Sequence, residues 1–537
     1  MTGLTHEHVH QDHLLAISIV GICILNVISL CAGSWLHQNH ILWFPECGIT
    51  IIIGFIVGMT IKSSIPPALL LTDANLFFDP TFFTLFLLPP IIFEAGYSLN
   101  MPLFWKNIGP ILSLAIFGTL ISTGVTWYFL YSDSTDWLID LSFSESGQFA
   151  ALISAVDPVA TLAIFTALKV DPNLNSIVVG ESVLNDAVAL ISFRAVTHYG
   201  INTFDEIESI SLAFVVTGVG SATVGCTIGA CAALTFRVMG MGKQPHLMPH
   251  VECIIFVLVA YISFVGAELF ENSGIVSSMF AGFTMRAYAR PNLSAPARVG
   301  IDQLLKVFAS LSENTVYLLV GLAITIELEY ITNEDLEGTT LHWVDANKAF
   351  LFVIVLAVAV RAVHVFPILN FFNCIAPSPE HVVPIGQQVV CWFSGLRGAI
   401  AVALAYQVAG DTDGGTANNK HIIRAATMMV VVFTTFAFGG ATPTLLSQMQ
   451  VATNCEPPTE EAKPAAGTIF KTLEDWLVDP DVEAAQYHEM HDHDNGTAPW
   501  RTKFPGVAQD FPKKNPAAPG VRTRLSRPEP LPNQMSA

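Results

Sequence analysis

Apolar blocks long enough to cross a lipid bilayer recur along most of this chain. Of its 537 residues, 52% are hydrophobic and only 13% are charged. The apolar residues gather into runs of about twenty, the length that an α-helix needs to span the hydrocarbon core. We count about thirteen such spans between Leu14 and Leu446. The pattern predicts an all-α polytopic membrane protein.

The predicted spans divide the chain into three parts. Residues 1–13 form a short extracellular or lumenal tail, residues 14–446 the transmembrane domain, and residues 447–537 a short cytosolic tail that is partly disordered. The orientation follows from Lys and Arg, which gather in alternate loops, as expected of the cytosolic side. The opposite loops are acidic and carry much of the net charge of −20. Such loops attract cations and repel nucleic acid, although they also simply keep short connections hydrated.

Two carboxylates lie inside the sixth span, where an apolar environment is expected. Glu181 and Asp186 fall within the apolar run of residues 174–193. A charge in the bilayer costs roughly 3 kcal/mol or more, so an intramembrane acid is interpreted first as an ion or proton site. Ser182 lies four residues before Asp186, so a helix places both side chains on one face. The same spacing joins Glu181 and Asn185, and the chain is therefore expected to move cations.

Asp186 is the residue on which we expect the chemistry to depend. A carboxylate held away from water can be neutralised by a proton or by a desolvated cation, and competition between the two couples their flows. Asn185 supplies dipoles without a second charge, and Ser182 offers a hydroxyl oxygen, the hard ligand type that Na+ prefers. No nucleotide motif accompanies these residues. Transport is therefore expected to follow the ion gradients, without ATP and without a cofactor.

The fifth span (148–168) is interrupted at Asp157 and Pro158, and the twelfth (385–408) at residues 394–399. Proline removes a backbone donor and glycine weakens a helix, so both spans can open and offer backbone groups to an ion. If the seventh span is a linker, six spans remain on each side with the broken helix fifth in both halves. This arrangement is typical of an inverted repeat around a midplane site. A proline kink or a small-residue packing contact explains either interruption taken alone.

Four sequence stretches lie on the third, fifth, sixth and twelfth spans. They are FLLPPIIFEAGY at 86–97, VDPVA at 156–160, GESVLND at 180–186 and GLRGA at 395–399. Together they resemble the signatures of eukaryotic sodium/proton exchangers of the cation/proton antiporter superfamily. The resemblance implies a homodimeric antiporter with inverted six-helix repeats, in which a core with crossed fifth and twelfth helices moves by alternating access. It also implies exchange of Na+ for H+ across the bilayer, which controls pH and cation content.

The resemblance assigns roles to individual residues. The ion- and proton-binding residues that it implies are Asp186, Asp157, Ser182, Asn185 and Glu94, with Na+ held at Asp186 and Asp157. Because an Asn-Asp pair marks the electroneutral members of the family, one cation is expected for each proton.

Three further groups of residues are candidates for other roles. The resemblance implies a structural ion pair between Glu181 and Arg397. It implies an inhibitor and access path lined by Phe86, Leu87, Pro89 and Phe93. Glu313 and Arg361 also lie inside apolar spans, where a pathway role and a simple ion pair are both open.

Three other functions remain open on the sequence alone. A related exchanger preferring K+ would share these motifs, because selectivity depends on cavity size and field strength, which motifs do not report. A cation channel would carry a net current without proton countertransport. A membrane-embedded sensor or scaffold would keep the fold without turnover. The location is open between Golgi or endosomal membranes and the plasma membrane, and the short tail favours the former.

Overall fold

The structure is a computed structural model that describes residues 2–39, 41, 43–64, 80–133, 141–157, 159–199, 207–240, 249–332, 343–375, 382–408, 417–455 and 476–478. Within these ranges every regular element is a helix. Eight helices are long and apolar enough to cross a membrane, and two shorter apolar helices cover Glu46–Ile61 and Phe83–Ser98. The predicted all-α membrane fold is confirmed. The count of thirteen spans stays a prediction, because the remaining apolar segments are short or broken.

The helices follow the apolar blocks in chain order. Those before residue 200 are α1 (Thr2–Gln38), α2 (Glu46–Ser64), α4 (Pro80–Phe82), η2 (Phe83–Leu87), α5 (Leu88–Ser98), α6 (Met101–Lys106), α7 (Ile108–Leu112), η3 (Ser113–Gly118), α8 (Thr119–Asp133), α9 (Phe143–Ser154), α10 (Val159–Leu168) and α11 (Pro172–Tyr199). Those after it are α12 (Ile207–Met239), α13 (Pro249–Leu269), α14 (Gly274–Thr284), η6 (Met285–Ala289), η7 (Arg290–Asn292), α15 (Ala295–Thr332), α16 (Trp343–Ile375), α17 (Ile385–Phe393), α18 (Ala399–Gln407), α19 (Ala417–Thr434), η9 (Thr435–Gly439) and α20 (Gly440–Gln448). Because α1 begins at Thr2, the residues expected as a separate tail, 1–13, largely continue the first helix.

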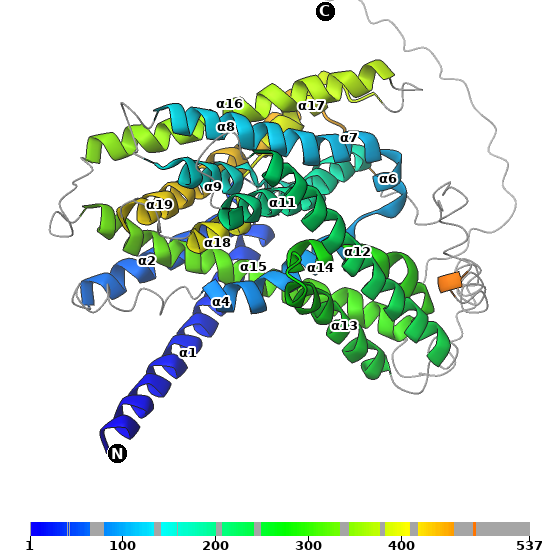
Figure 1. The fold of residues 1–537 in the computed structure, drawn as a ribbon, viewed down its shortest axis with the longest axis horizontal. Helices are drawn as coiled ribbons and strands as arrows, with labels where there is room; N and C mark the ends of the chain where they lie inside the picture. Colours follow the sequence, from blue (N-terminus) through cyan, green and yellow to red (C-terminus); the bar gives the residue numbers. More distant parts are fainter. Residues whose placement is uncertain are drawn as a thin grey trace, which may run out of the picture. The chain divides into compact units, whose positions relative to one another are not determined.

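Helix α11, which carries the two intramembrane acids, lies in the middle of the bundle (Figure 1). The most apolar part of its span is 83% buried inside the protein, against 17% for the corresponding part of α12. Helices α8 and α16 pack side by side along one edge, and α12, α13 and α14 pack together elsewhere. Protein rather than lipid therefore surrounds the acids of α11.

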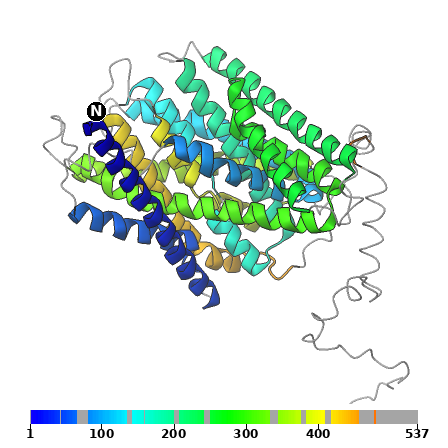
Figure 2. The same cartoon turned by 90° about the horizontal axis from the view of Figure 1, so that it is seen from below.

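Helices α2 and α15 are in backbone contact. A Cβ atom on Gly54 would meet the carbonyl oxygen of Leu318, and one on Gly321 would meet that of Ile51. Only residues without a side chain allow two helices to approach so closely. Helix α15 also packs against α5, α13 and α1 and reaches α18 and α19. Figure 2 shows this long helix crossing the bundle next to α1.

The two helices expected to be broken are both broken, and they touch. A non-helical segment separates α9 from α10 and another separates α17 from α18. The backbone N–H of Asp157 donates to the carbonyl oxygen of Leu396 at 2.9 Å, which joins the two segments directly. Pro158, the predicted cause of the first break, lies outside the described residues. The prediction of two broken crossing helices is confirmed.

The chain returns to the membrane domain after its last span. The backbone N–H groups of Asn454 and Cys455 donate to the carbonyl oxygens of Leu168 and Lys169, both at 2.9 Å. Further on, Leu477 is 2% exposed, and its carbonyl oxygen accepts a hydrogen bond from the Asn292 side chain at 2.8 Å. The segment between them, 456–475, and all residues from 479 lie outside the described residues. The predicted boundary at residue 447 stays a prediction.

Candidate ion-binding site

Two side chains of α11 hold the unwound segment between α9 and α10. The amide oxygen of Asn185 accepts a hydrogen bond from the Val156 N–H at 3.1 Å. The hydroxyl group of Ser182 donates to the carbonyl oxygen of the same residue. Unwinding leaves backbone groups without helical partners, and buried groups of this kind need replacements. The predicted ligands Ser182 and Asn185 therefore also position the backbone at the crossing, the place where the unwound segment between α9 and α10 meets the one between α17 and α18.

Asp186 lies next to this segment and is 8% exposed. Its Oδ1 atom has no hydrogen-bond partner among the described residues. The charged side chains that interact electrostatically with it are Asp157, which repels its negative charge, and Arg397, which attracts it. An ionised carboxylate left in this state is costly, because burial removes the water that would solvate it. A proton or a cation at Asp186 would remove that cost.

Asp157 lies in the first unwound segment, and its side chain contacts two other elements. Its Oδ2 atom accepts a hydrogen bond from the hydroxyl group of Tyr317 on α15 at 2.9 Å. The same carboxylate lies against Gly398, where any Cβ atom would overlap it. Gly398 is the N-cap of α18, so the carboxylate lies at the amino end of a helix, where free N–H groups favour negative charge. Glycine is needed here because of this close approach.

Two arginines neutralise the carboxyl ends of the broken helices. Arg397 donates to the carbonyl oxygens of Ser154 and Ala155 at 3.2 and 2.8 Å, at the end of α9. Arg361 donates to those of Cys391 and Trp392 at 2.8 and 3.0 Å, near the end of α17. The last carbonyls of a helix lack intrahelical donors and carry partial negative charge, which favours a cation there.

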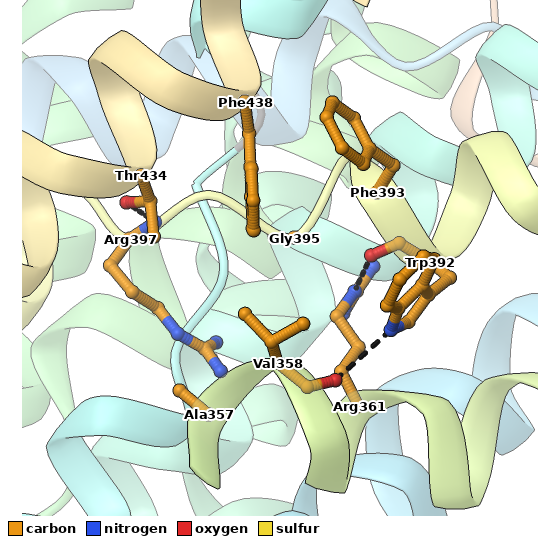
Figure 3. Close-up of a pocket in the computed structure, with 9 residues that line it drawn as sticks. All are labelled: Ala357, Val358, Arg361, Trp392, Phe393, Gly395, Arg397, Thr434 and Phe438. Carbon is orange, nitrogen blue, oxygen red and sulfur yellow. Dashed lines mark hydrogen bonds between the residues drawn. The ribbon is translucent and has the colours of Figure 1, made fainter. Parts of the chain in front are cut away.

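Figure 3 shows Arg361 and Arg397 on either side of Gly395, around a small cavity. Its volume is about 10 Å³, room for about one water molecule. The Nε atom of Arg397 has no hydrogen-bond partner among the described residues, although the side chain is only 3% exposed. A single water molecule in the cavity would suit this donor.

The predicted ion pair between Glu181 and Arg397 is wrong. Glu181 instead pairs with Arg361, whose two terminal nitrogens lie 2.9 and 3.2 Å from its two carboxylate oxygens. The two residues are 1% and 3% exposed. Arg397 instead donates to carbonyl groups at the end of α9. The guanidinium that binds Glu181 of α11 belongs to Arg361 of α16. Of the two roles left open for Arg361, the structure thus shows the ion pair.

Glu94 interacts with charged residues on α15. It interacts electrostatically with Lys306 and Glu313, and Glu313 in turn interacts with Asp157. Among the described residues, no hydrogen bond or ion pair joins Glu94 to Asp157 or Asp186. Glu313 thus interacts with both acids, and a role of Glu94 as a direct ligand stays a prediction.

The structure does not bring the four predicted access-path residues onto one open surface. Phe93 is 2% exposed and packs against the rings of Tyr97 and Phe256. Leu87 and Pro89 are also buried. Phe86, in contrast, is 60% exposed and stacks on Phe82. A role of these residues in an access path stays a prediction.

Sequence reasoning missed Tyr317, which hydrogen-bonds to Asp157 across 160 positions of the chain. The only signal was its place one helical turn after Glu313, at the start of an apolar stretch of the span. A single tyrosine in such a helix is more often a packing residue. Only the fold shows that its hydroxyl group reaches the crossing.

A bundle of membrane-spanning helices in which two broken helices cross beside a buried, incompletely bonded carboxylate defines a secondary ion transporter. The sodium proton antiporter MjNhaP1 from Methanocaldococcus jannaschii, solved at pH 8, has the same fold. It matches with a TM-score of 0.58 and 15% sequence identity, over 81% of this chain and 98% of that chain. The two chains therefore share a fold.

Sequence comparison places the chain more closely. Residues 27–448 match the family described as sodium/hydrogen exchanger, transmembrane. Sodium/hydrogen exchanger 5 of Arabidopsis thaliana is 33% identical over 446 residues, covering 82% of each protein. Human sodium/hydrogen exchanger 8 is 34% identical over 445 residues, covering 81% of this chain and 70% of the human protein. The endosomal/prevacuolar sodium/hydrogen exchanger of Saccharomyces cerevisiae is 32% identical, covering 80% and 67%. This chain belongs to the sodium/hydrogen exchanger family, and it is a multi-pass membrane antiporter.

Proposed function

We propose that the protein exchanges Na+ for H+ and that Asp186 carries the two ions in turn. The observation that supports this proposal is the buried Asp186 carboxylate, whose Oδ1 atom has no hydrogen-bond partner among the described residues. An acid in this position is stable when a proton or a cation neutralises it. Because one carboxylate accepts only one of them at a time, exposing it to the two sides of the membrane in turn exchanges the two ions.

The Na+ site that we propose uses oxygen atoms from the crossing. Asp186 and Asp157 supply the charge, and the hydroxyl group of Ser182 and the amide oxygen of Asn185 lie beside them on α11. An oxygen-only donor set suits a hard cation. We propose Glu94 as an acid that attracts Na+ from a distance, since it interacts with Glu313 and not with the crossing itself.

One Na+ is proposed to replace one H+, so that the exchange moves no net charge. Asn185 is neutral, and Asp157 is stabilised as a carboxylate by the Tyr317 hydroxyl group and by the amino end of α18. Asp186 is then the group in the crossing that changes protonation during the cycle.

We further propose that the protein works as a homodimer in Golgi or endosomal membranes, with its C-terminal residues in the cytosol. Similarity to the endosomal/prevacuolar exchanger of Saccharomyces cerevisiae supports the endomembrane location. The Lys and Arg residues of alternate loops support the orientation.

The test is flux through the purified protein in acid-loaded proteoliposomes that contain a pH-sensitive dye. External NaCl is expected to raise the internal pH, and a membrane potential imposed with valinomycin is expected to leave the rate unchanged. KCl is tested in parallel, and faster alkalinisation with KCl would replace Na+ by K+ as the substrate. A cation current without proton movement would overturn the proposal in favour of a channel.

A further inference from the structure

We infer that Tyr317 is a positioning residue for Asp157 and that its hydroxyl group sets the affinity of the site for Na+. This inference rests on the proposed exchange of Na+ for H+ at the crossing. The Tyr317 hydroxyl group donates to Asp157 Oδ2 at 2.9 Å, and the tyrosine is 4% exposed. The tyrosine is therefore buried, and its partner Asp157 is partly buried.

The hydroxyl group acts on one particular oxygen atom of Asp157. Oδ2 is also the atom of Asp157 that a Cβ atom on Gly398, at the start of α18, would meet first. Two elements thus restrain the carboxylate from different directions, α15 through a hydrogen bond and α18 through close packing. A carboxylate held in this way presents its second oxygen in a defined direction.

Hydrogen-bond chemistry fixes the direction of the effect. A donor bonded to a carboxylate favours the ionised form over the carboxylic acid. It thereby favours the form that binds a cation and disfavours the form that has taken up a proton. Loss of the donor is expected to let protons compete better with Na+ at the crossing.

The donor comes from a helix that is not itself part of the crossing. Helix α15 is neither of the broken helices, and its Gly321 lies in backbone contact with α2, one turn beyond Tyr317. The ring of Tyr317 also belongs to an apolar cluster that includes residues of α2, α11 and α18. The ring is therefore held in place by apolar packing as well as by the hydrogen bond of its hydroxyl group.

The chain contains a closely matched control. Tyr97 is also 4% exposed, and its hydroxyl group donates at 2.8 Å to a carboxylate oxygen of an aspartate. This aspartate is Asp302, a residue of α15. This second tyrosine–aspartate pair also involves Arg290, which bonds to the same aspartate at 2.7 Å. A Tyr→Phe change at either position removes one buried hydroxyl group and keeps the ring.

The experiment compares Tyr317→Phe, Tyr97→Phe and the wild type as full-length proteins in proteoliposomes. KM for Na+ and kcat are measured at about pH 6.5 and about pH 8, where proton competition differs. Tyr317→Phe is expected to raise KM for Na+ about tenfold at the lower pH and less at the higher pH, with kcat within twofold. Tyr97→Phe is expected to keep both values near those of the wild type.

A measurement that does not require transport accompanies the flux assay. Bound Na+ stabilises the folded protein, so the melting temperature in detergent rises with NaCl. The NaCl concentration that gives half of this rise should increase for Tyr317→Phe and not for Tyr97→Phe. Replacing Tyr317 with 3-fluorotyrosine, which keeps the ring and strengthens the donor, should move that concentration in the opposite direction.

The outcomes separate this inference from the function on which it rests. If the wild type exchanges Na+ for H+ but Tyr317→Phe matches Tyr97→Phe in both assays, the role of Tyr317 is refuted and the exchange stands. A fall in kcat with unchanged KM at both pH values refutes it in the same way. A wild type without Na+-dependent proton flux refutes the proposed function and this inference together.

Discussion

Glu181 and Asp186 are two buried carboxylates five residues apart on one helix, and their surroundings differ completely. Both oxygens of Glu181 accept hydrogen bonds from Arg361. Oδ1 of Asp186 has no such partner among the described residues, although its side chain is only 8% exposed. Glu181 is neutralised by Arg361, whereas Asp186 is left to be neutralised by a proton or a cation from solution. A buried charge without a built-in partner can bind and release an ion.

The comparison explains why the two acids should respond oppositely to neutralisation. Removing one member of a buried ion pair strands the other charge and costs about 3–5 kcal/mol. Neutralising a buried acid whose Oδ1 atom has no hydrogen-bond partner among the described residues removes an unfavourable burial and should cost little stability. Glu181 is therefore expected to support the fold, and Asp186 to support transport.

Asp186→Asn should have the largest effect on transport. The amide keeps the shape of the side chain but binds neither a proton nor Na+ as a counterion, so Na+-driven proton flux is expected to fall more than about a hundredfold. Flux in proteoliposomes measures the loss, and the melting temperature in detergent should stay at or above that of the wild type. Surviving cation-dependent proton flux would show that Asp186 is not the carrier.

Arg361→Gln should have the largest effect on stability. It leaves Glu181 buried and uncompensated, and we expect a loss of about 3–5 kcal/mol, seen as a low yield of folded protein. The double variant Glu181→Gln, Arg361→Gln removes both charges and should recover much of that yield. Normal abundance of the single variant would mean that the pair is not needed for the fold.

Gly398→Ala should weaken the site through shape alone. The added Cβ atom would overlap the Asp157 carboxylate, which must turn away, and overpacking of this kind costs about 1–3 kcal/mol. KM for Na+ is expected to rise about tenfold, which is the kinetic equivalent of about 1.4 kcal/mol. Gly124→Ala is the matched control, since nothing lies within 4 Å of the Cβ atom it would add. Equal KM values for the two variants would contradict the close approach at Gly398.

Asn185→Asp should have the smallest and most specific effect. An aspartate oxygen can still accept the hydrogen bond from the Val156 N–H, so the unwound segment should keep its place. The variant adds a second ionisable group to the crossing and is expected to make the flux respond to an imposed membrane potential. A voltage response identical to that of the wild type would remove Asn185 from the charge balance of the cycle.

Much of the helical fold could be predicted from local sequence. Apolar runs located the spans, and glycine and proline located both broken helices, because each of these signals acts on the backbone nearby. The shared face of Ser182 and Asp186 follows from helix geometry alone.

The partners of the buried charges could not be predicted in the same way. Whether Arg361 or Arg397 reaches Glu181 depends on how α16 packs against α11, across 180 positions of the chain. Tyr317 has no sequence signature, because one hydroxyl group in an apolar helix matters only through the atom that it meets. Phe93 belongs to a motif associated by resemblance with inhibitors, yet its ring is in a packed core.

The glycine contacts between α2 and α15 should make these two helices move as one rigid unit. With the carbonyl oxygens of Leu318 and Ile51 directly against the Gly54 and Gly321 backbones, no side chain separates the helices and lets them slide. The distance between α2 and α15 is therefore expected to stay constant and can serve as a reference. Spectroscopic labels placed on α2 and on α15 should keep a constant separation throughout the cycle, while the separation of either label from one on α11 measures how far the helix that carries Asp186 moves.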